Sequence, residues 1–371
     1  MMFNIENFRN RQQRLAQVLQ RLEVGGAVLI RPEHVQYFTG FRPVPVLQGV
    51  VVIFPDGKTL LSAPNHIPDI HAAHECVSYE AQWNCTLRQD QLTAAMKALE
   101  PLLPSNFLRN RIAIEFSANP AAVLQANHGA MGNNIDLEPE LWRMRRCKDS
   151  DELALIEQAI ACTEAMYARA RSLVKPGLTE LEIYNELHAA AVMTAQEPLL
   201  AVGNDFQCNS AGGTPRPRPV QQGELLILDL GVSYQGYYSD NCRTLSVGGP
   251  PSQEQQQAWE AVHRVLEFVE AEVRPGVSAK NLFQQARKQL DAHRPGSFFH
   301  HLGHGIGLSP HEMPHVNDCW DEYFEEGDVF TAEPGLYAPE LKAGLRLEQD
   351  YLVTASGVKC LTSHPLDLYL G

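Results

Sequence analysis

The feature that most constrains the fold is an internal repeat in the second half of the chain. The segment that begins at Val174 reads VKPGLTELEIYNEL, and the segment that begins at Val273 reads VRPGVSAKNLFQQA. Both run valine, base, proline, glycine, an aliphatic residue and a hydroxyl residue before a helical pattern. The hydroxyl residues, Thr179 and Ser278, are typical helix N-caps. Matching segments of this kind predict two copies of one supersecondary unit.

A predicted strand pair follows each helix, and each strand carries a carboxylate at a matching place. GELLILD ends at Asp229 and GDVFTAE ends at Glu333, while GYYSD ends at Asp240 and GLRLE ends at Glu348. A two-residue turn at residues 234–235 predicts that Asp229 and Asp240 lie opposite each other on one face of a hairpin. Glu333 and Glu348 can meet in the same way across their longer connection.

The four carboxylates together favour a metal site. Each acid taken singly is more typical of the surface end of a strand, but LLILD is apolar and places Asp229 at the end of a buried strand. Four carboxylates that meet on a buried face repel one another unless cations neutralise them. Oxygen-rich donor sets with an imidazole suit Mn²⁺, Co²⁺, Fe²⁺ or Zn²⁺. Two such ions about 3.5–4 Å apart lower the pKa of a shared water to about 7 and polarise a carbonyl.

A source of imidazoles is the stretch HHLGHGIGLSPHEMP, which covers residues 300–314. Within it stand four histidines, and a fifth follows directly: His300, His301, His304, His311 and His315. The glycines between them exclude an amphipathic helix and an unbroken strand. From this stretch alone, metal binding or acid–base chemistry and a histidine-rich surface loop both stay open.

The quoted motifs, taken together, resemble those of a known enzyme family. LDLGVSYQGYYSDNCRT, GHGIGLSPHEMP, TAEPGLY and GLRLEQDYLVT are similar to motifs of the metallopeptidases that include methionine aminopeptidase, aminopeptidase P, prolidase and creatinase. The resemblance covers residues from about 150 to 371 and implies the pseudo-two-fold α/β "pita-bread" fold. The leading part resembles, more weakly, the creatinase-type N-terminal α/β domain, which favours the Xaa-Pro peptidase branch. We therefore expect an N-terminal domain over residues 1–145 and a catalytic domain over residues 146–371.

The resemblance implies a set of five metal ligands. These are Asp229, Asp240, His304, Glu333 and Glu348, and together they would hold two divalent ions. Glu333 would also carry the proton from water to the leaving amine. Arg346 would orient the neighbouring carboxylates.

The resemblance also assigns two further histidines. His311 would contact the substrate or the tetrahedral intermediate, and His300 would be another active-site histidine. His301 and His315 receive no role, and we expect them to face solvent.

One departure from the family pattern lies in the loop before the first strand pair. These peptidases normally carry another histidine there, but residues 208–219 read CNSAGGTPRPRP, and the corresponding position is Gly212. Loss of a donor to the substrate or oxyanion costs about 10²–10³ in rate. A substitute would have to come from the N-terminal domain of a dimer partner or from this loop, which offers Asn209, Ser210, Thr214, Arg216 and Arg218.

Composition argues against several other classes of protein. The chain has 30 basic and 44 acidic residues and a net charge of −14, so it has no basic field for nucleic acid or an anionic membrane. No apolar run approaches the ~18 residues of a membrane span, and the first residues lack the apolar core of a secretory signal. Eight scattered cysteines are typical of reduced thiols, so we expect a cytoplasmic location.

The function that follows is hydrolysis of the Xaa-Pro bond in short peptides by a homodimer with two metal ions. Mn²⁺ is the favoured metal, while Co²⁺, Zn²⁺ and Fe²⁺ stay open, as does the choice between dipeptidase and aminopeptidase. An alternative is a non-peptidase member of the same fold, such as a creatinase-like C–N hydrolase or lyase, which the missing loop histidine favours. Another is a binding protein or low-activity pseudoenzyme, against which the five intact ligand positions argue.

Overall fold

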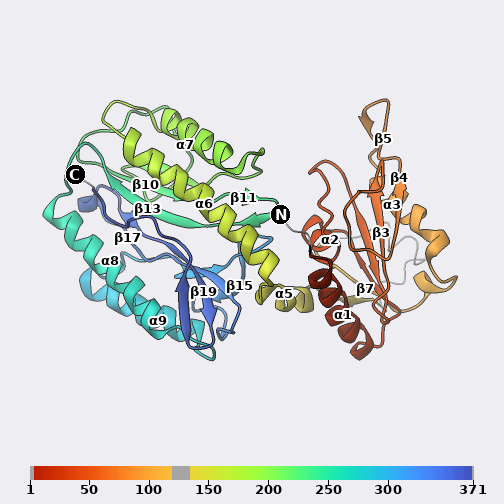
Figure 1. The fold of residues 1–371 in the computed structure, drawn as a ribbon. Helices are drawn as coiled ribbons and strands as arrows, with labels where there is room; N and C mark the ends of the chain where they lie inside the picture. The colour runs from red at the N-terminus through yellow and green to blue at the C-terminus, as the bar shows by residue number, and fades with distance from the viewer. Residues whose placement is uncertain (1–3, 119–133, 370–371) are drawn as a thin grey trace. The chain divides into compact units, whose positions relative to one another are not determined.

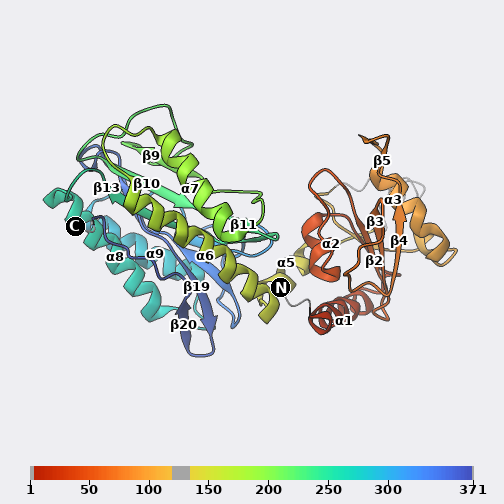
Figure 2. The ribbon, with the colours of Figure 1, turned by 45° about the horizontal axis from the view of Figure 1, so that its top comes forward.

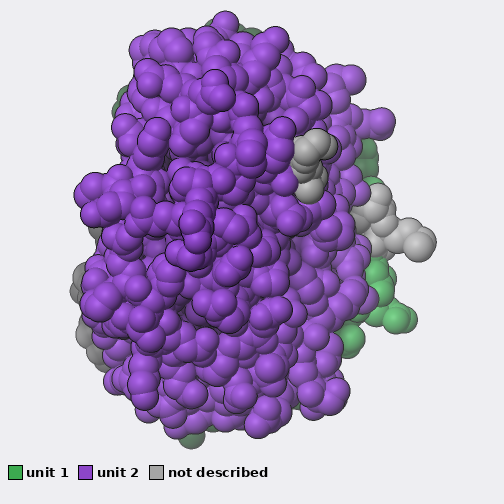
Figure 3. All heavy atoms as spheres, turned by 90° about the vertical axis from the view of Figure 1, so that its left-hand side faces the viewer, with its two compact units in different colours: residues 1–144 green, residues 145–371 purple. Residues whose placement is uncertain are grey.

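The computed structural model describes residues 4–118 and 134–369 and has two compact units, residues 1–144 and residues 145–371 (Figures 1 and 3). The domain limits expected at residues 145 and 146 stay a prediction, because compactness alone does not show that a unit folds independently. None of the helices in the described ranges combines the length and the apolar character that crossing a bilayer requires.

The first unit is built around a six-stranded mixed sheet with the order β4-β3-β2-β1-β7-β8. Its strands are β1 (Ala27–Leu29), β2 (Val50–Ile53), β3 (Thr59–Pro64), β4 (Glu75–Tyr79), β7 (Ala113–Ile114) and β8 (Ile135–Asp136), and a separate hairpin joins β5 (Gln82–Trp83) to β6 (Thr86–Leu87). Its helices are α1 (Ile5–Arg21), α2 (Pro32–Thr39), α3 (Gln91–Leu99) and α5 (Glu138–Arg146), with 3₁₀ turns at Glu100–Leu102 and Phe107–Arg109. All four residues of β2 are apolar and buried, as is typical of a strand inside a sheet. Its Val50 and Val52 belong to one core with Ala95 and Met96 of α3.

The second unit contains two larger sheets, two small two-stranded sheets (β11-β12 and β17-β18) and two pairs of helices. One sheet has the order β13-β10-β9, and the other has the order β15-β14-β16-β19-β20. The helices are α6 (Ser150–Leu173), α7 (Glu180–Ala195), α8 (Gln253–Glu272) and α9 (Ala279–His293). The strands of the first sheet and its small hairpin are β9 (Asp205–Cys208), β10 (Leu225–Leu230), β11 (Ser233–Tyr234), β12 (Tyr237–Tyr238) and β13 (Asn241–Ser246). The remaining elements are β14 (Gly303–Gly305), β15 (Glu312–Val316), β16 (Val329–Ala332), β17 (Gly335–Leu336), a 3₁₀ turn (Pro339–Leu341), β18 (Leu345–Arg346), β19 (Gln349–Thr354) and β20 (Gly357–Cys360).

The predicted repeat is present in this second unit. The helix pair α6–α7 precedes the strands β9, β10 and β13, and the helix pair α8–α9 precedes the strands β14, β16 and β19. The predicted N-caps are confirmed, because Thr179 Oγ1 accepts from Glu182 N at 3.1 Å and Ser278 Oγ accepts from Asn281 N at 3.1 Å. Figures 1 and 2 show α6 and α7 on one side of the unit, α8 and α9 on the other, and the strands between them.

Side-chain alternation decides which residues face the space between the two sheets. Leu226 and Leu228 on β10 pack in one core with α6 and α7, and Phe330 and Ala332 on β16 pack in another core with α8 and α9. Because side chains alternate along a strand, the residues between them face away from the helices. Asp229 follows Leu228 and Glu333 follows Ala332, so both carboxylates face the space between the two sheets.

The first hairpin differs from its predicted register by one residue in the turn. Tyr234 pairs with Tyr237, so the turn is Gln235–Gly236, and the turn predicted at residues 234–235 is wrong. Both turn residues have positive φ, 46° and 90°, as a type I′ turn requires.

The shifted turn moves one carboxylate by two positions along its strand. Asp229 pairs with Cys242, so Asp240 lies on the same face but diagonal to Asp229. In the second hairpin the register gives a different result. Ala332 pairs with Gln349, and Gly335 pairs with Arg346, so the same register places Glu333 opposite Glu348.

The two sheets meet along a seam, which we define as the contacts between residues 242–244 and residues 346–348. Glu348 N donates to Cys242 O at 2.9 Å, and Arg243 Nη1 donates to Glu348 O at 2.6 Å. Thr244 Oγ1 donates to Arg346 O at 2.9 Å and accepts from Arg346 N at 3.0 Å. The seam therefore fixes the carboxylate strands of one half against those of the other.

Candidate metal centre

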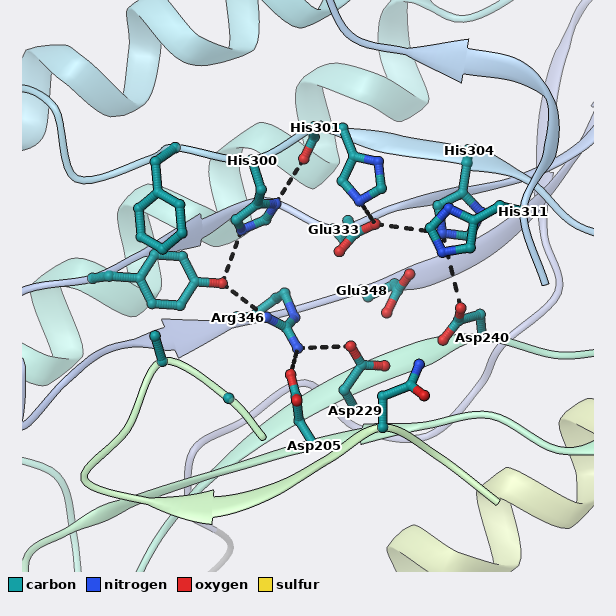
Figure 4. A pocket seen from close by; sticks show the side chains of 15 residues that line it. Asp205, Asp229, Asp240, His300, His301, His304, His311, Glu333, Arg346 and Glu348 are labelled. Atoms are coloured by element: carbon teal, nitrogen blue, oxygen red, sulfur yellow. Dashed lines mark hydrogen bonds and ion pairs between the residues drawn. The ribbon is translucent and has the colours of Figure 1, made fainter. Parts of the chain in front are cut away.

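Four buried carboxylates and one buried imidazole converge between the two sheets (Figure 4). One ligand atom from each of Asp229, Asp240 and Glu348 lies within 4.8 Å of the others, and the same is true of His304, Glu333 and Glu348. The structure thus brings together all five residues that the sequence resemblance nominates as ligands. They line a pocket of about 420 Å³.

The charges and unsatisfied oxygens of this cluster fit bound cations. Within residues 4–118 and 134–369, the buried oxygens Asp229 Oδ1 and Glu348 Oε2 have no hydrogen-bond partner. Burial raises the pKa of Asp229 to about 6 in spite of the opposing charge of Arg346. Burial and the neighbouring carboxylates also raise the pKa values of Asp240 and Glu348 well above the ordinary range. Bound divalent ions would neutralise the repulsion between these carboxylates and would be coordinated by the unpartnered oxygens.

His304 is held in the tautomer that a metal ligand needs. Its Nδ1 lies 3.1 Å from Gly305 O, and because a carbonyl can only accept, Nδ1 carries the proton. The lone pair on Nε2 then faces the carboxylates, 3.6 Å from Glu333 Oε1 and 3.8 Å from Asp240 Oδ2. Burial lowers the pKa of His304 to about 3, so the ring is neutral at physiological pH.

Two glycines allow the strand that carries His304 to approach its neighbours this closely. A Cβ atom at Gly303 would overlap Thr331 O, and a Cβ atom at Gly305 would overlap Met313 O. Any side chain at either position would push β14 away from its partners. The glycines of the GHGIG motif therefore place the imidazole at the centre.

A hydrogen-bonded chain supports the opposite side of the centre. Arg346 Nη2 donates to Asp229 Oδ2 at 2.6 Å and to the Asp205 carboxylate, while Arg346 Nη1 donates to Tyr337 Oη at 3.0 Å. His300 Nδ1 donates to a backbone carbonyl at 2.8 Å, so its Nε2 accepts from Tyr337 Oη at 2.9 Å. Burial lowers the pKa of His300 to about 4. Arg346 thus contacts a predicted ligand directly, and His300 joins this chain through Tyr337.

Sequence reasoning missed two members of this chain. Tyr337 is the last residue of the TAEPGLY motif, and its place in the same motif as Glu333 was the signal that could have identified it. Asp205 belongs to no motif, and only the fold places it beside Arg346.

His301 lies in the pocket, so the expectation that it faces solvent is wrong. Its Nε2 is 3.0 Å from Glu333 Oε1, and only 28% of its side chain is exposed. His311 also lines the pocket, with its ring stacked on His304 at a centroid distance of 3.7 Å. His315 is half-buried outside the pocket, where it contacts Glu322 and stacks on Trp320.

The loop that lacks a histidine is closed around Asp205. The Asp205 carboxylate accepts from Gly213 N, and a Cβ atom at Gly212 would overlap that carboxylate. The polar residues offered as substitutes do not line the pocket. Arg216 is paired with Glu180 and Arg218 with Glu224, and neither Asn209, Ser210 nor Thr214 reaches the pocket wall.

Comparison with known proteins gives a consistent result. The sequence pattern of metallopeptidase family M24 matches residues 154–355, and the pattern of the creatinase/prolidase N-terminal domain matches residues 11–147. An uncharacterized peptidase of Staphylococcus epidermidis is 33% identical over 234 residues, which are 62% of this chain and 66% of that protein, slightly less than two thirds of its length.

Two solved structures match over almost their whole length. The prolidase from Pyrococcus furiosus has a TM-score of 0.80 and 24% identity, and the match covers 94% of this chain and 99% of that one. The X-Pro aminopeptidase from Thermotoga maritima has a TM-score of 0.79 and 25% identity, and the match covers 96% of this chain and 99% of that one. At 24% identity, the prolidase likeness shows the fold alone.

Proposed function

The chain belongs to metallopeptidase family M24, and we propose that it uses two divalent metal ions to hydrolyse the peptide bond before proline in short peptides. The family resemblance is confirmed, and so is the α/β fold with a creatinase-like N-terminal domain and a pita-bread catalytic domain. The observation that carries the proposal is the convergence of four buried carboxylates and one neutral imidazole, from both halves of a repeat, on a single pocket.

The proposed ligands offer mostly oxygen donors. Asp229, Asp240, His304, Glu333 and Glu348 would hold the ions, and this donor set suits Mn²⁺, which we propose as the metal. When bound, two such ions lower the pKa of a water molecule to about 7 and polarise the scissile carbonyl. Arg346 holds Asp229 in place from the other half of the repeat.

Glu333 is the residue to which we assign proton transfer. Burial alone would raise its pKa, but the hydrogen bond from His301 lowers it, as do the rings of His301, His304 and His300, which are protonated at the low pH where Glu333 titrates. Together they lower the pKa of Glu333 to about 2. The carboxylate is therefore ionised at neutral pH. It can accept a proton from the attacking water at an oxygen and deliver that proton to the leaving amine.

His311 is the residue to which we assign contact with the substrate carbonyl. It lines the pocket, is more exposed than His304, and stacks on that ring. A neutral imidazole in this place can donate a hydrogen bond to a developing negative charge on the carbonyl oxygen. Burial and the neighbouring His301 lower the pKa of His311, which favours the neutral form.

An aromatic pair supports the preference for proline. Phe299 and Tyr337 line the pocket with ring centroids 4.8 Å apart, and Phe299 is 68% exposed. A large apolar ring exposed beside a polar centre offers a flat face to the pyrrolidine ring of proline. A solved structure similar to this chain, that of an X-Pro aminopeptidase, points to the same substrate class.

A peptide panel tests the proposal. The protein is loaded with Mn²⁺, its metal content is measured, and release of the N-terminal amino acid is followed for Ala-Pro, Gly-Pro and Ala-Pro-Ala, with Ala-Ala and Gly-Leu as controls. We expect release from the proline peptides only, and the tripeptide separates aminopeptidase from dipeptidase activity. Bound metal without release from any proline peptide would contradict the proposal and favour another C–N hydrolase reaction.

Two further points are proposals with less support. A homodimer rests on the family resemblance alone, and a cytoplasmic location rests on sequence features alone. Sedimentation equilibrium of the loaded protein tests the first, and fractionation of cells that express the chain tests the second.

A further inference from the structure

His301 lines the pocket, but the proposed function gives it no role of its own. Its Nε2 lies 3.0 Å from Glu333 Oε1, and its ring lies beside the stacked pair of His304 and His311, with centroid distances of 5.3 and 5.6 Å. Figure 4 shows the ring pointing at Glu333 from the segment that precedes β14. A carboxylate oxygen only accepts, so Nε2 is the donor in this contact.

The repeat contains a counterpart of this contact. Asp229, near the end of β10, and Glu333, directly after β16, hold equivalent positions in the two halves, and each receives a hydrogen bond from a basic side chain. Arg346 Nη2 donates to Asp229 Oδ2 at 2.6 Å, and His301 Nε2 donates to Glu333 Oε1 at 3.0 Å. Each equivalent carboxylate thus has one oxygen oriented by a neighbour that lies farther from the centre of the cluster.

The opposite wall of the pocket cannot supply this support. It is formed by Asn204, Asp205, Ala211 and Gly212, and the Asp205 carboxylate is already bound by Arg346 and by the backbone of the loop. Of the other pocket imidazoles, His300 has both ring nitrogens engaged elsewhere. His301 is therefore the donor placed to orient Glu333.

We propose that His301 is a positioning residue for Glu333, which it holds in the orientation for metal binding and proton transfer by a hydrogen bond from Nε2. The proposal rests on the proposed function, in which Glu333 is a ligand and the proton carrier. Hydrogen-bond partners of ligating carboxylates act in this way in metal sites, and their loss costs about 10–100-fold in metal affinity or activity.

Two substitutions separate the hydrogen bond from the ring. His301→Phe keeps an aromatic ring beside His304 and His311 but removes the donor, whereas His301→Gln keeps an N–H donor on a side chain of similar reach. We expect His301→Phe to weaken Mn²⁺ binding and to lower kcat for Ala-Pro, each by about tenfold to a hundredfold, with KM and the number of bound ions unchanged. His301→Gln should restore most of both losses.

Metal affinity is measured by competition with a chromophoric chelator, and stoichiometry by atomic emission. The matched control is His315→Phe, which removes a histidine from a similar contact with Glu322 outside the pocket and should change neither quantity. A lost ion in His301→Phe that Gln does not restore would make His301 a ligand and overturn the proposal. A raised KM with unchanged kcat and affinity, or no change at all, would overturn it as well.

The two proposals fail in distinguishable ways. If the wild-type protein binds Mn²⁺ but cleaves no proline peptide, the proposed reaction is wrong. The comparison of metal affinity between His301→Phe and His301→Gln needs no substrate and still decides the role of His301.

Discussion

The two halves of the repeat in the second unit contribute unequally to the pocket. Each half gives two of the carboxylates proposed as ligands, Asp229 and Asp240 from the first and Glu333 and Glu348 from the second. The imidazoles that line the pocket come from the second half, and they are His300, His301, His304 and His311. The duplicated framework thus supplies the negative charge that would hold cations, while the groups that would handle substrate and protons differ between the halves.

The two halves differ at β9 and β14, the strands that pair with β10 and β16. When the two sheets are aligned on Asp229 and Glu333, the counterpart of His304 on β14 is Gln207 on β9. His304 points into the pocket, whereas Gln207 Nε2 donates to Thr214 O at 2.7 Å and stabilises the adjacent loop. The same strand position therefore serves the centre in one half and the loop in the other.

The largest effect on kcat should come from replacing either of the equivalent carboxylates, Glu333 and Asp229, by its amide. Glu333→Gln removes the proposed proton carrier, so we expect kcat at saturating Mn²⁺ to fall by about 10²–10⁴-fold. Asp229→Asn removes a ligand without a proton role and should lower kcat less under the same conditions. Equal losses of kcat in the two variants would contradict the proposal that Glu333 has a role in proton transfer that Asp229 lacks. The control is Glu322→Gln, which alters a Glu–His contact outside the pocket and should keep wild-type kcat.

A smaller effect should follow from crowding the loop of the first half. In Gly212→Ala the added Cβ atom would displace the Asp205 carboxylate, which supports Arg346. We expect kcat/KM for Ala-Pro to fall by about tenfold to a hundredfold, as for loss of other groups that orient a ligand. Gly249→Ala is the matched control, since nothing lies within 4 Å of its added Cβ atom. Wild-type kinetics in Gly212→Ala would show that the loop does not act on the centre.

The turns of the two halves give a prediction about stability. Gly236 closes the first hairpin with φ 90°, so Gly236→Ala should lower the free energy of unfolding by about 1–2 kcal/mol. Gly357 lies at the turn between β19 and β20 in the second half, without positive φ and with open space at its Cβ, so Gly357→Ala should change little. Urea unfolding of the metal-free protein measures both, and equal effects would contradict the difference in turn geometry.

The smallest effect concerns pH and the C-terminal segment that packs on the first half. His364 stacks on Tyr167 and accepts from Arg171 Nε at 3.0 Å, and burial beside Arg171 and Arg243 lowers its pKa to about 4. The unfolded chain binds a proton at this side chain near pH 6.5, whereas the folded chain does not. Stability should therefore be lost as pH falls from about 6.5 toward 4.

His364→Gln should reduce this loss, which is read from urea midpoints at pH 7.5 and pH 5. His293 is exposed at the end of α9, so His293→Gln serves as the control and should follow the wild type. An unchanged pH dependence of stability in His364→Gln would show that the contacts of His364 with Tyr167 and Arg171 do not make the first half sensitive to acid.

Strand parity explains how much of the centre could be predicted. The equal spacing of carboxylates in the two copies fixes which face of each hairpin they occupy, and a turn shifted by one residue moves Asp240 two positions along its strand without changing its face. The turn itself was missed because Gln235 adopts a positive φ that the sequence gives no reason to expect. In the second hairpin the expected pairing of Glu333 with Glu348 matches the register.

The remaining contacts depend on distances between segments that are remote in sequence. His301 points at Glu333, and the spacing of residues within a glycine-rich stretch does not reveal that direction. Asp205 is joined to Arg346 across more than a hundred residues, so no local pattern marks it. Packing of the two halves, and not the motifs, creates both contacts.

The seam has a consequence for how the chain could be divided. Arg243 belongs to the first half, yet its guanidinium binds the backbone oxygen of Glu348, and Arg346 of the second half binds Asp229 of the first. A polypeptide cut in the exposed stretch near Gly249 would give two fragments that each hold half of the acidic groups. Neither fragment alone has the full donor set, so cation uptake by a mixture of the two would report their reassembly.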